Sequence, residues 1–171
     1  MTSTLRSLFA RNYMKVALVL APLVFIGAEC DPTGPAATPL AMDAMRANIA
    51  GDGSFFCDNV SGQANGNLIT IVAQGDNTVQ DRRIELVIPK QTTVPYTINV
   101  ASDAQGLIYY CIPLTATSCK NFYADVEHGG TGTITVTHID GYVEGTFRGT
   151  VTLANGNETR SISGGEFKVD Y

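Results

Sequence analysis

Residues 131–153 read TGTITVTHIDGYVEGTFRGTVTL, and this stretch decides the fold. Asp140-Gly141 separates two runs in which apolar and polar residues alternate, the strongest short-range signal for a β-hairpin. A two-residue loop there pairs Ile139 with Tyr142 and sorts both runs into an apolar and a polar face, with His138 as the exception at the hairpin end. The predicted apolar pairs are His138–Val143, Val136–Gly145 and Ile134–Phe147, and the polar pairs are Thr137–Glu144, Thr135–Thr146 and Thr133–Arg148.

The connection at Asn155-Gly156-Asn157 extends this hairpin into a meander. A two- or four-residue loop would send Phe167 to the polar face, whereas a three-residue loop keeps the faces consistent. That register places Gly145 opposite Phe167, Phe147 opposite Gly165 and Val143 opposite Val169. Large rings over glycines on a neighbouring strand fill the missing side-chain volume. Residues 131–170 are therefore predicted to form a three-stranded meander with one buried face.

The rest of the chain from about residue 44 consists of short β-rich segments broken by Gly, Asn and Asp, without helical periodicity. This pattern predicts an all-β domain, an antiparallel meander of about eight to ten strands forming a small barrel or sandwich. The predicted strands lie near 44–50, 53–60, 67–74, 82–89, 95–100, 107–112, 119–127, 131–139, 142–153 and 159–170.

Residues 1–29 have the features of a secretory signal. Arg6, Arg11 and Lys15 precede the apolar run VALVLAPLVFIGA at 16–28. These 13 residues are too few to span the ~30 Å hydrocarbon core of a bilayer as a helix. We therefore expect the run to be removed, with translation beginning at Met1 or at Met14.

The end of this run, Ile26-Gly27-Ala28-Glu29-Cys30, resembles the lipobox of bacterial lipoproteins. In that pattern the cysteine becomes the lipidated first residue of the mature chain, so the resemblance implies a lipid anchor on Cys30. Glu29 stands where the pattern has Gly, Ala or Ser. Cleavage near Ala28 by an ordinary signal peptidase, with Cys30 a plain thiol, is the alternative.

The sequence thus divides into a signal peptide at 1–29, a Pro-rich tether at 30–43 and a β domain at 44–171. Residues 1–29 hold three of the eleven basic and one of the sixteen acidic residues, so the remainder has a formal charge of −7. Apart from Arg82-Arg83 the basic residues are scattered, which argues against nucleic acid as a partner. We expect the cell envelope as the location, with the outer membrane or the periplasmic face as the anchoring site. A soluble periplasmic or secreted protein is the alternative.

Three cysteines remain beyond Cys30. Cys111 and Cys119 flank the segment 112–118, which contains Pro113 and is interpreted as a loop, so a Cys111–Cys119 disulfide at the loop's base is expected. Cys57 would then be free. Pairing of Cys57 with either of the other two stays open.

The domain also resembles a family of uncharacterised bacterial lipoproteins of the Bacteroidetes type, a domain of unknown function with a calycin-like barrel. The matching segments are 45–51 (MRANIAG), 83–86 (RIEL), 95–98 (PYTI), 132–137 (GTITVT), 143–147 (VEGTF) and 163–169 (SGGEFKV). The resemblance implies a small β-barrel on a lipid anchor. It brings no catalytic residue to this chain.

Chemistry-bearing motifs are scarce in this sequence, and we expect no enzyme activity, no metal site and no cofactor. His128 precedes Gly129-Gly130 in a predicted turn, and His138 lies beside Asp140 at the end of the predicted hairpin, so neither is expected to act as a general base. One aromatic cluster, Tyr109, Tyr110, Phe122 and Tyr123, is a candidate ligand-facing wall, and the alternative is that half of these rings are core and half lie on the strand surface.

Two functions of different class follow from these patterns. The first is an envelope-anchored binding or interaction module for a small apolar ligand or a protein partner, using the barrel interior or exposed strand edges. The second is a purely structural envelope lipoprotein that supports a larger assembly. A secreted enzyme ranks behind both, because it would need a cleft that gathers Cys57 or a histidine with acidic partners.

Overall fold

The computed structural model describes residues 38–74, 82–115 and 118–171, and Pro39–Tyr171 form one compact unit. The described residues contain no helix and form eleven strands. No helix among them is long and apolar enough to cross a bilayer. The strands are β1 (Ala44–Ile49), β2 (Gly53–Cys57), β3 (Val60–Asn65), β4 (Leu68–Gln74), β5 (Arg83–Pro89), β6 (Tyr96–Asn99), β7 (Leu107–Thr115), β8 (Ser118–Ala124), β9 (Thr131–Asp140), β10 (Tyr142–Leu153) and β11 (Thr159–Asp170).

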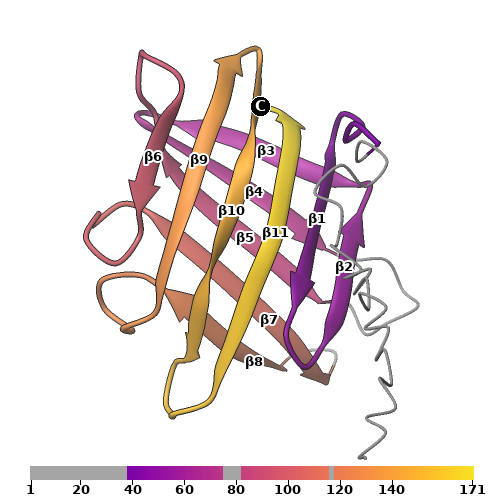
Figure 1. Cartoon of the computed structure of the whole chain (residues 1–171), viewed down its shortest axis with the longest axis vertical. Helices are drawn as coiled ribbons and strands as arrows, with labels where there is room; N and C mark the ends of the chain where they lie inside the picture. Colours follow the sequence, from indigo (N-terminus) through magenta and orange to yellow (C-terminus); the bar gives the residue numbers. More distant parts are fainter. Residues whose placement is uncertain (1–37, 75–81, 116–117) are drawn as a thin grey trace, which may run out of the picture. The chain divides into compact units, whose positions relative to one another are not determined.

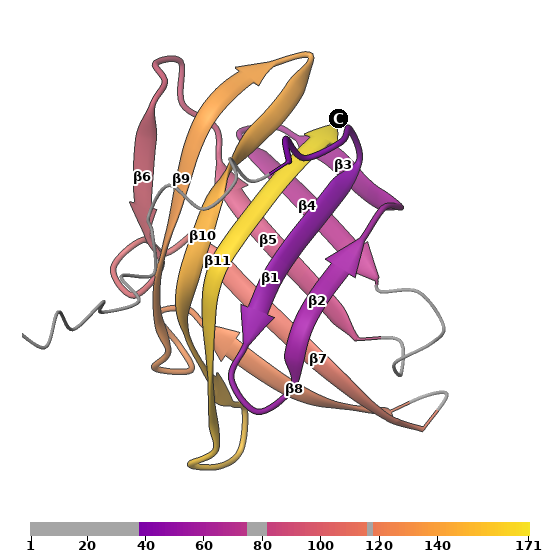
Figure 2. The ribbon, with the colours of Figure 1, turned by 45° about the vertical axis from the view of Figure 1, so that its right-hand side comes forward.

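All strand pairs are antiparallel, and together they make a nearly closed barrel (Figure 1). The strand order is β2-β1-β11-β10-β8-β7-β5-β4-β3, and β9 pairs with β10 and carries β6 at its other edge. Figures 1 and 2 show a flattened barrel whose two layers cross at a large angle: β3, β4, β5, β7 and β8 behind, and β6, β9, β10, β11, β1 and β2 in front. The long strand β10 links them, because it pairs with β9 over residues 142–150 and with β8 at Thr152 and Leu153.

The all-β prediction is confirmed. The structure adds a strand, β3, that the sequence pattern does not predict. The sequence pattern predicts the end of a strand at residue 60 and a turn from Gly62 onward, yet residues 60–65 form β3 and pair with β4. Only Asp58 and Asn59 separate β3 from β2. The sequence VSGQAN lacks the apolar alternation of a predicted strand, because most of its side chains are exposed.

The β9–β10 hairpin has the predicted register away from its turn and a different one next to it. Gly145 pairs with Val136 and Phe147 with Ile134, as predicted. Near the turn, however, Asp140 pairs with Tyr142, Ile139 with Val143 and His138 with Glu144, and a β-bulge leaves Thr137 as the extra residue. The predicted Ile139–Tyr142 pair is therefore wrong. The bulge lets Ile139 pack against the core and moves His138 to the polar face.

The β10–β11 pairing shows the same kind of compensation. Gly145–Phe167, Phe147–Gly165 and Val143–Val169 are paired as predicted. The loop is not the predicted three-residue one, since the Leu153 amide donates to the Glu158 carbonyl across residues 154–157. A second bulge sets Ser163 and Gly164 opposite Arg148 and restores the register beyond it.

A buried arginine closes part of the barrel seam between β2 and β5. Strand β2 has β1 as its strand partner among the described residues. Arg82, directly before β5 and only 8% exposed, donates from Nη1 to the Asp52 carbonyl (2.7 Å) and from Nη2 to the Ser54 carbonyl (2.8 Å). One side chain thus bonds a carbonyl of the β1–β2 turn, at Asp52, and a carbonyl of β2, at Ser54.

The core fills the space between the two layers. Ile and Leu side chains from β4, β5 and β7 belong to the same buried cluster as Phe147, Phe167 and Val143 from β10 and β11. The Phe147 and Phe167 ring centroids lie 6.3 Å apart. The buried face of the meander predicted from the sequence is therefore one wall of this core.

Candidate functional site

The four rings of the predicted ligand-facing wall point to two different sides of the sheet. Tyr110 and Phe122 are fully buried in the core. Tyr109 and Tyr123 lie on the outer face, and each is half-buried. Successive side chains of a strand alternate between faces, so neighbours in sequence separate. The structure does not bring the four together into one wall.

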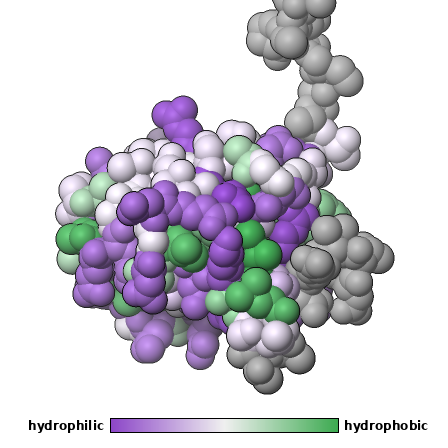
Figure 3. Space-filling view, turned by 90° about the horizontal axis from the view of Figure 1, so that it is seen from below, coloured by the Kyte–Doolittle hydropathy of each residue, from purple (hydrophilic) through white to green (hydrophobic). Residues whose placement is uncertain are grey.

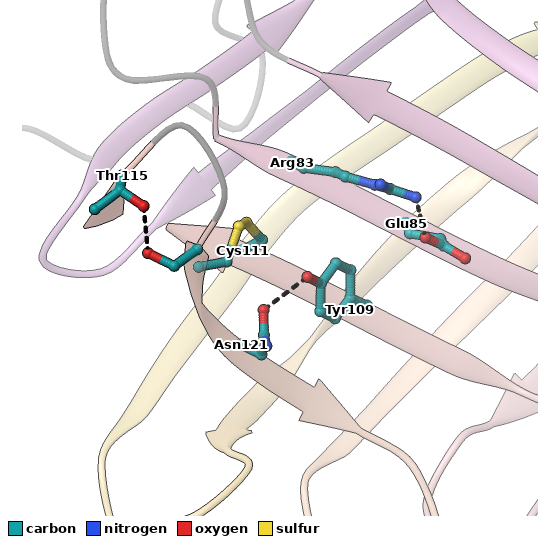
Figure 4. Close-up of a disulfide and its surroundings, with 8 residues drawn as sticks. Arg83, Glu85, Tyr109, Cys111, Thr115 and Asn121 are labelled. Atoms are coloured by element: carbon teal, nitrogen blue, oxygen red, sulfur yellow. Dashed lines mark hydrogen bonds and ion pairs between the residues drawn. A yellow bond between two sulfur atoms is a disulfide. The ribbon is translucent and has the colours of Figure 1, made fainter. Parts of the chain in front are cut away.

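The outward pair, Tyr109 and Tyr123, is covered by its own neighbours. Their ring centroids lie 5.1 Å apart, and His128 stacks on Tyr123 at 4.2 Å. Tyr109 donates from Oη to Asn121 Oδ1 at 2.8 Å (Figure 4). Burial, and then the Coulomb effect of Tyr123, raise the pKa of Tyr109. The rings therefore contact each other and His128 on the outer face, and both stay partly exposed.

The Cys111–Cys119 disulfide forms, as predicted, with a Cα–Cα distance of 5.7 Å (Figure 4). It does not sit at the base of a loop. β7 continues to Thr115 and β8 begins at Ser118, so the bridge joins two paired strands. Cys57 is free and buried, and its Sγ donates to the Gln74 carbonyl at 3.1 Å.

A charged cluster lies around the turn between β1 and β2. Asp52 Oδ2 accepts from Tyr110 Oη (3.1 Å) and from Arg160 Nε (3.0 Å), and Arg160 also bonds Glu158 (2.7 Å). Burial above all raises the pKa of Tyr110 to about 12. The buried Tyr110 ring thus connects β7 to the turn between β1 and β2 through its bond to Asp52. Figure 3 shows the molecule from below, with apolar groups visible in patches between hydrophilic ones.

Each of the two histidines contacts residues close to it in the sequence. His128 Nδ1 bonds the Asp125 carboxylate at 2.8 Å within one turn, and that carboxylate also accepts from the His128 amide. His138 stacks on Tyr142 with centroids 3.9 Å apart. Within residues 38–74, 82–115 and 118–171, no three His, Cys, Asp or Glu side chains gather as they would around a metal ion.

The outer face of β6, β9, β10, β11 and β1 is covered by short hydroxyl side chains, and this face is turned to the reader in Figure 1. The strand registers align them in rows that cross the sheet. The first row is Thr97, Thr135, Thr146, Glu166 and Arg46, the second is Asn99, Thr133 and Arg148, and the third is Thr131, Thr150 and Ser161.

Two hollows open in this face, and we call them together the outer-face groove. One has a volume of about 460 Å³ and is lined by Thr97, Thr133, Thr135, Thr146, Phe147, Arg148, Gly164, Gly165 and Glu166. The other, of about 480 Å³, is lined by Asn99, Thr131, Gly132, Thr133, Arg148, Gly149, Thr150, Ser161, Ile162 and Ser163. They adjoin because Thr133 and Arg148 line both. Both hollows are shallow and open to solvent, so a ligand would lie along this face rather than inside a cavity.

The hollow shape comes from a backbone irregularity in β11. Gly164 and Gly165 oppose the single residue Ala47 of β1, while Ser163 and Gly164 oppose the single residue Arg148 of β10. Gly164 has φ +57°, and a Cβ on Gly165 would lie 2.4 Å from the Phe147 carbonyl oxygen. Glycine suits position 164 because of the positive φ and position 165 because there is no room for a Cβ. Bulges of this kind often re-aim side chains beside binding sites.

Among the basic residues that the structure describes, Arg148 is the one with no ion pair, hydrogen bond or ring contact of its side chain. Arg46, Arg83, Lys120, Arg160 and Lys168 lie in ion pairs with carboxylates. Arg82 bonds two carbonyls, and Lys90 Nζ lies 5.0 Å from the Tyr171 ring centroid. Arg148 is exposed and has no such contact with any described residue. At the groove rim, Arg46 and Glu166 pair at 2.6 Å.

Sequence reasoning did not find this groove. The alternate threonines of 131–137 and 146–152 were interpreted as the polar face of a meander. Their alignment with Thr97 and Asn99 of β6 and with Arg46 of β1 needs contacts between distant segments. The sequence signal that could have indicated it is Ser163-Gly164-Gly165, a glycine pair within a strand, which often marks a bulge.

No protein-family model, no curated protein and no solved structure matches this chain. Cys30, the signal segment and residues 30–37 of the tether lie outside the described residues. The anchor and the resemblance to Bacteroidetes-type lipoproteins therefore stay predictions.

Proposed function

We propose that this chain is an exported, lipid-anchored protein of the cell envelope whose β domain is a non-catalytic module that binds a saccharide in the outer-face groove. The observation that carries the proposal is the groove itself: two adjoining hollows in which Thr and Ser side chains supply about half of the lining residues. Hydroxyls both donate and accept hydrogen bonds, as sugar hydroxyls do. A surface of this composition matches a sugar better than an apolar ligand.

A peptide is less suited to this groove. Extended peptides bind by adding a strand to a sheet edge, with pockets for alternate side chains. The groove lies on the face of the sheet, where most backbone groups are engaged in the β6–β9–β10–β11–β1 ladders. Its apolar lining, Phe147 and Ile162, consists of core residues that are 2% exposed.

The envelope location rests on residues 1–30 and is supported by the Cys111–Cys119 disulfide, since disulfides persist mainly in oxidising compartments. Intact-mass measurement of the protein from its native membrane fraction tests the anchor. A chain that starts at Cys30 and carries acyl mass is expected. An unmodified soluble chain that starts at Glu29 or later would remove the anchor from the proposal.

The binding site is tested with the mature chain in detergent on an array of purified oligosaccharides. Thr146→Trp places a large ring in the first row of the groove, where Thr146 is exposed and lines one hollow. Thr159→Trp is the matched control, because Thr159 is exposed in the neighbouring strand β11 and lines neither hollow. We expect wild type and T159W to give the same saccharide signals and T146W to lose them. Equal signals from all three proteins, or none from wild type, would refute the proposal.

A further inference from the structure

We propose that the saccharide bound in the outer-face groove is acidic, and that its carboxylate pairs with Arg148. This inference rests on the proposed function and names the ligand class for the same site. It starts from the contrast between Arg148 and the other basic side chains of the described residues.

The position of Arg148 suits one acid group flanked by sugar rings. Its side chain lines both hollows, so a ligand that fills them passes this guanidinium at its centre. The two parallel N–H groups of a guanidinium match the two coplanar oxygens of a carboxylate. Thr133, next to it in the second row, and Thr146, Thr150 and Ser161 in the flanking rows offer hydroxyls to the sugar on either side.

The charge around the groove limits how acidic the ligand can be. The chain as a whole has a formal charge of −5, and Glu166 stands at the groove rim. The other cation at that rim, Arg46, is already paired with Glu166. Arg148 is the basic residue that lines the two hollows, so one singly charged acid group per site matches it. Densely charged chains such as polysulfates or nucleic acids need clusters of cations.

The bulge explains why Arg148 faces open space. Opposite it, β11 supplies Ser163 and Gly164, which present a small hydroxyl and no side chain, and β9 supplies Thr133. A carboxylate at the position of Gly164 could have paired with Arg148. Because glycine stands there, the Arg148 guanidinium stays available to a ligand carboxylate.

The test uses two probes of equal length, a galactose tetramer in which one residue is replaced by galacturonic acid and the corresponding all-galactose tetramer, titrated calorimetrically into the mature chain. We expect wild type to bind the acidic tetramer, more weakly as salt is added, and to prefer it over the neutral one. Arg148→Gln should weaken binding of the acidic tetramer about tenfold or more and leave the neutral tetramer unchanged. The affinity of Arg148→Lys for the acidic tetramer should lie between those of wild type and Arg148→Gln, because lysine keeps the positive charge but lacks the two parallel N–H groups of a guanidinium.

The outcomes separate this inference from the function on which it rests. If T146W abolishes binding of both tetramers while R148Q leaves the acidic one unchanged, the saccharide site stands and the role of Arg148 is refuted. If neither variant changes binding, both proposals fail. Equal binding of a free carboxylate without sugar, tested with succinate, would overturn the saccharide part. T159W serves as the control throughout, and unchanged circular dichroism establishes that each variant folds.

Discussion

Replacing Arg82 with methionine tests how the barrel is closed. Arg82→Met keeps most of the apolar stem and removes a guanidinium that donates to the Asp52 and Ser54 carbonyls at 2.7 and 2.8 Å. Hydrogen bonds to charged groups each contribute about 1.5–3 kcal/mol. In the variant, water can bond to the two freed carbonyls, and the folded state no longer has to bury a charged group. Both effects reduce the loss of stability. We therefore expect the free energy of unfolding to fall by about 3 kcal/mol.

Urea denaturation of wild type and variant measures this loss directly. For a domain of this size, about 3 kcal/mol corresponds to a midpoint of thermal unfolding lower by about 10 °C. Hydrogen exchange should speed up first at the amides of β1 and β2. Arg83→Met is the matched control: Arg83 is 40% exposed and pairs with Glu85 on the outer face, so that variant should lose less than about 1 kcal/mol.

A loss below about 1 kcal/mol in R82M, or a loss equal to that of R83M, would refute the reasoning. The barrel would then be closed by core packing and by the β8–β10 and β2–β3 connections, without help from the arginine.

The remaining predictions concern the core, the disulfide and a buried tyrosine. Phe147→Ala should cost about 3–5 kcal/mol in urea denaturation, because its ring is 2% exposed and packs on Phe167; a loss under about 1 kcal/mol would contradict a packed interior. The double variant Cys111→Ser, Cys119→Ser opens a bridge between residues eight apart and should cost about 2–3 kcal/mol, whereas an unchanged midpoint would mean that the strand pairing alone holds these segments. The pKa of Tyr110 is about 12, above the value of about 10 in an unfolded chain, so the unfolded state loses its proton first and stability should decrease from about pH 10 through about pH 12. Tyr110→Phe should reduce that slope in alkaline denaturation curves, and an identical slope would count against a shifted pKa.

Much of the fold can be predicted from the sequence, because the alternation of apolar and polar residues in a strand depends only on neighbouring residues. Alternation over 131–170 and the turn at Asp140-Gly141 place Phe147, Phe167 and Val143 on one buried face, and the structure pairs them as predicted. The disulfide can be predicted for the same reason, because Cys111 and Cys119 lie on consecutive strands. The turn details are not readable. Each loop differs by a residue from the prediction, and a bulge further along each strand absorbs the difference.

The sequence alone determines an all-β domain, a buried meander and the expectation of export. The tertiary structure decides which residues make the groove. Thr97, Thr133, Arg148 and Ser161 come from four strands, and their common face exists because β6 pairs with β9 and β11 bulges between β10 and β1. Whether Arg148 is left without a partner likewise depends on what the neighbouring strands place opposite it. The pattern along a strand reports which face a side chain takes, whereas its neighbours across the sheet are set by pairings between distant segments, which no local pattern encodes.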